Sequence, residues 1–146
     1  MSRTIEDVQQ YLKTVAGRQG FNSWMNPNVV TAEADVLELE VDVRPEMTQH
    51  HGYVHGGIVT AFADTAAAWS AALASLEDVV TSNFTVHLMA PAMGNKLKAV
   101  AKPVKVGRSN VTVSVNVYSV NEDQQEKLCA TILSAIAVVR DRGGKL

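Results

Sequence analysis

The sequence predicts an α+β fold in which a curved antiparallel sheet wraps around one long buried helix. Segment 53–75 supplies the helix, because after two glycines it holds mostly alanine and large apolar residues, no proline and a single acid. A helix that is apolar on nearly every side has to be buried on nearly every side. Four segments with the two-residue period of strands follow it. Strands that follow a single apolar helix can bury it only by curling around it.

The N-terminal segment 4–16 predicts an amphipathic helix that packs on the body as an edge cover. Thr4 is its candidate N-cap, and Gly17 and Gly20 end it. Its apolar residues recur at helical spacing: Ile5, Val8, Tyr11, Leu12 and Val15. The 146 residues fit a single domain. We divide it into an N-terminal helical segment (1–20), a body (21–140) and a tail (141–146).

Segment 20–28 predicts a loop, because it holds a proline and three asparagines, which are frequent in turns. We expect its apolar side chains to plug the core beneath it, with a substrate-pocket wall as the alternative; they are Phe21, Trp24 and Met25. Two strands follow, over 29–35 and 36–43. In the second, leucine and valine alternate with acids, which is typical of a strand with one packed and one solvated face.

After the central helix, strands are predicted over 79–88, 96–106, 110–120 and 127–140, with turn-forming residues between them. Six strands on one side of one helix leave an unpaired edge. Pairing that edge with a second copy of the chain is the natural way to close it. We therefore expect a homodimer, or a tetramer built from two dimers.

The composition narrows the classes of partner. A formal net charge of −2 gives no drive toward nucleic acid or an anionic membrane surface. The single cysteine, Cys129, excludes an internal disulfide framework and fits a reducing compartment, so we expect a cytoplasmic protein. The first residues lack the features of a signal peptide. The central helix carries Asp64 and many small residues, which favours a buried soluble helix over a membrane span.

Asp64 and the two glycines that begin the central helix form a candidate reaction centre. Asp64 lies about two turns into an apolar helix, where a carboxylate is costly unless it is paired or used. Gly56 and Gly57 would weaken a helix that needed only stability. They let a ligand approach the free N–H groups of the first turn. The structural alternative is a buried Asp64 that only hydrogen-bonds a neighbouring loop or subunit.

Other chemistry has weaker support. His51 and His55 have the i, i+4 spacing of some metal ligands, but there is no HExxH motif and no cysteine pair, so we expect no metal site. His55 can instead hold the helix start by hydrogen bonding. Cys129 is expected to be a small core residue and His87 a packed or interface residue. Ser70 lacks the GxSxG turn of serine hydrolases.

Three motifs carry a resemblance to a known family: Gln49-x-x-Gly52-x-x-His55-Gly56-Gly57 with Asp64 after it, Met89-Ala90-Pro91-Ala92, and Val106-Gly107-Arg108. From about residue 41 to residue 139 the chain resembles the hotdog-fold acyl-CoA thioesterases. The closest likeness is to the branch of the phenylacetate-degradation and 4-hydroxybenzoyl-CoA thioesterases. The resemblance implies the hotdog fold, a homodimer whose sheets join edge to edge, and active sites at the dimer interface.

The resemblance also implies roles for single residues. Asp64 takes the position of the acid that acts as nucleophile or general base. Gly56 supplies the N–H that polarises the thioester carbonyl, and His55 is the motif histidine before it. Gln49 stands where relatives position water or the thioester. Thr81 falls where some relatives have a serine that orients the attacking water.

The expected activity is hydrolysis of an aryl-, short- or medium-chain acyl-CoA to the acid and free coenzyme A. No cofactor is expected, because coenzyme A is part of the substrate. Ala68 departs from relatives with a threonine one turn after the acid, which weakens the case for a 4-hydroxybenzoyl substrate. Two alternatives on the same fold stay open: an acyl-CoA hydratase or dehydratase, and a non-enzymatic acyl-CoA-binding module.

Substrate binding is expected at the helix start and at one turn of the sheet. Gly57 offers a second amide beside Gly56. The phosphates of coenzyme A need basic groups, and the best local cluster surrounds the turn after segment 96–106. The residues expected to bind there are Lys105, Gly107, Arg108 and Ser109. The alternative for this cluster is an ordinary solvated strand end.

Overall fold

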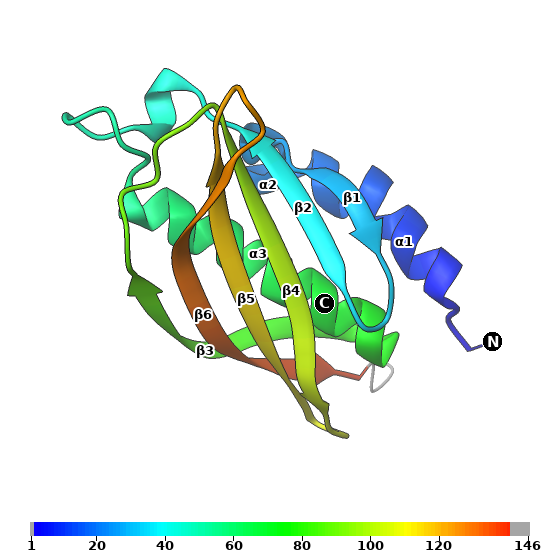
Figure 1. Cartoon of the computed structure of the whole chain (residues 1–146). Helices are drawn as coiled ribbons and strands as arrows, with labels where there is room; N and C mark the ends of the chain where they lie inside the picture. Colours follow the sequence, from blue (N-terminus) through cyan, green and yellow to red (C-terminus); the bar gives the residue numbers. More distant parts are fainter. Residues whose placement is uncertain (1, 141–146) are drawn as a thin grey trace.

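A computed structural model describes residues 2–140 of the chain. Helix α3 (Gly56–Ser75) lies along the concave side of a six-stranded antiparallel sheet (Figure 1). The strand order across the sheet is β1-β2-β4-β5-β6-β3. The strands are β1 (Asn28–Ala32), β2 (Leu37–Asp42), β3 (Asp78–Leu88), β4 (Lys96–Val106), β5 (Asn110–Val120) and β6 (Glu126–Val139). This architecture confirms the predicted fold class.

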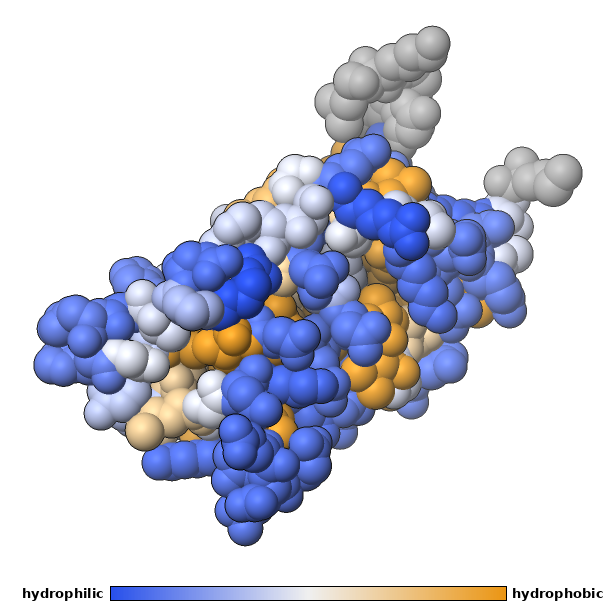
Figure 2. Space-filling model, turned by 90° about the horizontal axis from the view of Figure 1, so that it is seen from above, coloured by the Kyte–Doolittle hydropathy of each residue, from blue (hydrophilic) through white to orange (hydrophobic). Residues whose placement is uncertain are grey.

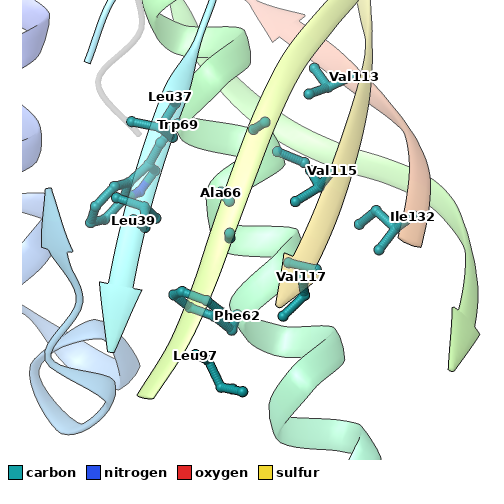
Figure 3. Packing of buried hydrophobic residues seen from close by; sticks show 14 of the residues in the cluster. Leu37, Leu39, Phe62, Ala66, Trp69, Leu97, Val113, Val115, Val117 and Ile132 are labelled. Atoms are coloured by element: carbon teal, nitrogen blue, oxygen red, sulfur yellow. The ribbon is translucent and has the colours of Figure 1, made fainter. Parts of the chain in front are cut away.

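The core forms where α3 meets the inner face of the sheet. Phe62 and Ala66 of α3 are fully buried, and the small alanine side chains let the strands approach the helix closely. Figure 3 shows side chains of β2, β4, β5 and β6 pointing toward this helix; those labelled are Leu37, Leu39, Leu97, Val113, Val115, Val117 and Ile132. By length and composition α3 could cross a membrane, but its burial here is that of a core helix.

Helix α1 (Ile5–Thr14) packs against α3 beside the β1 edge of the sheet (Figure 1). The predicted N-cap is confirmed: Thr4 accepts a hydrogen bond from the Asp7 N–H at 3.2 Å, and Asp7 accepts one from the Thr4 N–H at 2.8 Å. This reciprocal pair is a capping box. Val8 and Leu12 anchor the helix in the core. A short 3-10 helix, η1 (Ala16–Arg18), follows it, and another, η2 (Pro45–Met47), follows β2.

The predicted loop over 20–28 is wrong in part, because helix α2 (Gly20–Met25) occupies most of it. Asn26 ends α2 in the left-handed conformation (φ 55°), and its N–H bonds to the Asn22 carbonyl at 2.7 Å. The asparagine read as a turn signal is therefore a helix C-cap. Of the expected core plug, Met25 is buried, but Phe21 and Trp24 are 49% and 39% exposed and stack on each other.

Strand β3 has an unpaired edge, because within residues 2–140 it pairs with β6 alone. Its register shifts between Thr81 and Asn83, so Ser82 is the extra residue of a bulge. As a result Thr81 before the bulge and Phe84 and Leu88 after it all lie on the helix side of the sheet. Phe84 and Leu88 are nevertheless 38% and 54% exposed. Figure 2 shows hydrophobic side chains reaching the surface in patches between hydrophilic ones.

Candidate active site

His55 forms the N-cap of α3. Its Nδ1 accepts a hydrogen bond from the Gly57 N–H at 2.9 Å, which confirms that His55 holds the helix start. A Cβ on Gly57 would stand 3.0 Å from that ring nitrogen, so the glycine lets the ring approach. The Gly57 amide, which we expected to bind substrate, is thus already bonded to His55.

The N–H of Gly56 is the amide of the first helical residue and has no intrahelical acceptor. A cavity of about 350 Å³ opens beside it. Gln49 and Leu88 are among the residues lining this cavity, so the predicted site residues Gln49 and Gly56 are brought together. Gln49 is held in place because its Oε1 accepts a hydrogen bond from the His51 N–H and its own N–H bonds to the Tyr53 carbonyl at 2.8 Å.

Asp64 is paired with Thr81. The Thr81 hydroxyl donates a hydrogen bond from Oγ1 to Asp64 Oδ1 at 2.7 Å, joining β3 to the middle of α3. Both residues are partly buried, so Asp64 is less enclosed in the single chain than its apolar surroundings in the sequence predicted. No cation pairs with this carboxylate among residues 2–140. The two predicted residues are therefore hydrogen-bonded to each other, and both remain partly exposed to solvent.

The two halves of the predicted centre do not meet within one chain. Gly56 and Asp64 are eight residues apart on α3, which is about 12 Å along the helix axis. The cavity beside Gly56 is not lined by Asp64. A carbonyl bound by the Gly56 amide is therefore out of reach of Asp64 in the same chain. The expectation that they lie close together on one element is corrected by this spacing.

The turn between β4 and β5 places Arg108 and Ser109 against the end of β6. Arg140 Nη2 donates to the Arg108 carbonyl at 3.2 Å, and a surface cavity of about 470 Å³ lies beside these residues. Gly107 is needed in the turn, because a Cβ there would come within 2.8 Å of the Asn110 carbonyl oxygen. Lys105 lies two residues before Gly107, near the end of β4, and is exposed. The basic tail beyond Arg140 lies outside the described residues.

Among the remaining candidates, Cys129 has the structural role expected of it. Cys129 is buried, its Sγ lies 3.3 Å from the Val117 carbonyl, and burial raises the pKa of its thiol, as expected of a core cysteine. The rings of His50 and His51 lie 4.0 Å apart in the loop before α3. Within residues 2–140 no three His, Cys, Asp or Glu side chains are grouped so that they could hold a metal ion. His87 is exposed on β3.

Two features were missed at the level of sequence. Leu88 lies against the helix start: a Cβ on Gly56 would meet its Cδ1 at 2.7 Å. A second cavity, of about 310 Å³, lies between α1 and α3 and includes Ala68 in its wall. Neither carries a sequence signal, because both depend on how separate elements pack.

Comparisons with known proteins find similar sequences. The model of the thioesterase superfamily matches residues 51–126, a segment that includes Gly56, Asp64 and Thr81. The protein named "Putative esterase ComA2" of Bacillus subtilis (strain 168) is 32% identical over 115 residues, which cover 75% of this chain and 85% of that protein.

Solved structures show the same fold. A thioesterase family protein from Silicibacter pomeroyi superposes with a TM-score of 0.83 at 27% identity, covering 90% of this chain and 98% of that one. The PaaI protein from the phenylacetic acid degradation operon of E. coli superposes with a TM-score of 0.78 at 19% identity, covering 91% and 94%.

Proposed function

Because the chain belongs to the thioesterase superfamily, we propose that it hydrolyses an acyl-CoA to the free acid and coenzyme A. One observation carries the proposal: a carboxylate held by a hydroxyl, Asp64 with Thr81, lies on an apolar helix that begins at an open amide, Gly56. Thioester hydrolysis needs both a group that activates the attack and a donor for the developing oxyanion.

The two groups meet in a dimer formed through β3. Thr81 and Leu88 are seven residues apart on this strand. Leu88 lies beside Gly56 at the start of α3, and Thr81 is hydrogen-bonded to Asp64. If two β3 strands pair antiparallel about a two-fold axis at Thr85, Thr85 lies opposite its own copy, and the extra residue of the bulge at Ser82 brings Thr81 of one chain opposite Leu88 of the other. Asp64 of one chain then faces Gly56 of the second chain. The exposed Phe84 is covered by the same pairing.

The reaction follows from this arrangement. The Gly56 N–H of one chain donates to the thioester carbonyl oxygen, aided by the positive end of the helix dipole. Asp64 of the other chain either takes a proton from the attacking water or attacks the carbonyl carbon itself; in both cases the C–S bond breaks and coenzyme A leaves as a thiolate that takes up a proton. In the second case the acyl group remains on Asp64 as an anhydride, and a water molecule then hydrolyses it to release the acid and restore the carboxylate. Thr81 orients Asp64, and Gln49 orients the thioester or the water.

Coenzyme A binding is assigned to the basic turn. Val111 of β5 lies opposite Ile136 of β6, which lies opposite Thr81 of β3. Arg108 in the turn is three residues before Val111. Three residues along a strand are about 10 Å and two strand spacings across the sheet are about another 10 Å, so the turn lies roughly 14 Å from Thr81, a span that the pantetheine arm can bridge. Charged nucleotide phosphates would then meet the residues of the turn, which are Lys105, Gly107, Arg108 and Ser109, with Arg140 beside them. None of these steps requires a metal or an organic cofactor.

Release of free thiol from acyl-CoA esters tests the proposal. We expect wild-type protein to hydrolyse at least one aryl-, short- or medium-chain ester. Asp64→Asn should lower kcat about 10²–10⁴-fold, the usual contribution of a general base. The variant should melt at the wild-type temperature, because Asn can still accept the hydrogen bond from Thr81. Wild-type turnover in this variant would remove Asp64 from the reaction.

A further inference from the structure

The second cavity borders α3 one and two turns beyond Asp64, and neither Asp64 nor Thr81 lines it. Ala68 and Ala72 follow Asp64 at intervals of four residues, so the three lie in one row on α3. Both alanines line the cavity. On the strand side, Val79 shares the face of Thr81 and also lines it. An acyl chain whose carbonyl lies at Asp64 would therefore reach this space by following the row along the helix.

The wall of the cavity is apolar and is completed by the N-terminal helix. Tyr11 and Leu12 of α1 face Trp69 of α3 across it. The charged lining residues are Arg3, Glu77 and Asp78, and the Asp78 side chain is 74% exposed. An Arg3–Asp78 ion pair of 2.8 Å ties the chain before α1 to the start of β3, and the guanidinium lies 5.4 Å from the Tyr11 ring centre.

We propose that this cavity binds the acyl group of the substrate and that α1 sets its size; this rests on the proposed function. The occupant is an uncharged, apolar acyl group of medium size, either an alkyl chain or an aryl ring. The volume of about 310 Å³ lies at the lower end of the range for small-molecule pockets. No charged partner for a polar acyl end lies among the α3 residues that form its floor, which are Ala68, Trp69 and Ala72.

Substitutions in the row on α3 can test how far the acyl group extends from Asp64. Ala68→Leu fills the cavity one turn from Asp64, and Ala72→Leu fills it two turns away. We expect Ala72→Leu to lower kcat/KM for decanoyl-CoA by about tenfold or more while sparing butanoyl-CoA, since one methylene in a pocket is worth about tenfold or more. Ala68→Leu should lower kcat/KM for both hexanoyl-CoA and decanoyl-CoA and leave kcat/KM for acetyl-CoA unchanged. Ala74→Leu, on α3 but outside every cavity described above, is the matched control.

A variant that enlarges the cavity completes the test. Tyr11→Ala removes an α1 side chain from the wall, and we expect it to shift the preferred acyl group toward longer chains. If Ala68→Leu and Ala72→Leu lower kcat/KM equally for all acyl chain lengths, or leave the dependence of kcat/KM on chain length unchanged, the acyl group does not enter this cavity. That outcome differs from failure of the proposed function, in which the wild type would release no thiol from any ester.

Discussion

Thr81 Oγ1 donates a hydrogen bond to Asp64 Oδ1 across 2.7 Å and thereby joins strand β3 to helix α3. It is the only hydrogen bond to this carboxylate formed within residues 2–140, so it fixes Asp64 while leaving Oδ2 to act on a reactant. The bond also couples the carboxylate to the edge strand through which we propose that two chains pair. Catalytic geometry and dimerisation therefore depend on the same element.

Thr81→Val should lower kcat about tenfold or more, because Asp64 loses the donor that orients it while the side-chain volume is kept. Thr81→Ser restores the hydroxyl and should retain most of the activity. The measurement is kcat and KM for both variants with the best acyl-CoA substrate. Equal rates for the Val and Ser variants would show that the hydrogen bond does not serve catalysis.

Gly56→Pro removes the proposed oxyanion donor without breaking the helix. Proline is well tolerated at the first helical position, and His55 has the extended backbone (φ −57°, ψ 133°) that a residue before proline prefers. We expect kcat to fall about 10²–10³-fold, the usual cost of one such donor.

The matched control is Gly56→Ala, which adds a Cβ but keeps the N–H. That Cβ meets only the tip of the Leu88 side chain, which is 54% exposed and can move. We expect a much smaller loss of activity than for the proline variant. If both variants lose activity to the same extent, the added bulk rather than the missing amide is responsible.

Phe84→Asp should produce a monomer that is folded but inactive. The substitution places a charge beside the proposed two-fold axis, opposite an apolar Val86 and diagonally across from its own copy. Sedimentation velocity measures the mass, and circular dichroism checks the fold. Val30→Asp, on the opposite edge strand β1 and 48% exposed, is the control and should leave the assembly intact. A Phe84→Asp protein that stays active as a monomer would refute the shared site.

The sequence predicted those elements whose signal is local. Strands β4 and β5 begin and end where their alternation begins and ends, and the capping box at Thr4 is readable from Thr4 and Asp7 alone. Helix α2 was missed because Asn22 within it and Asn26 at its end signal turns equally well.

The candidate site was predicted as a set of residues but not as an arrangement. Asp64, Thr81, Gln49 and Gly56 were all named, yet their division into two groups follows from the rise of α3 and the bulge at Ser82. A bulge and a packing cavity depend on contacts between distant segments, and no local pattern of residues encodes them.

The most direct measurement of the central claim is complementation between two inactive chains. Asp64→Asn and Gly56→Pro are produced together with different affinity tags, and the dimer carrying both tags is purified and assayed. If Asp64 of one chain works with Gly56 of the other, one of the two sites in this dimer is intact and about half of the wild-type activity returns. If both groups act within one chain, each chain is defective and the mixed dimer stays as inactive as its parents.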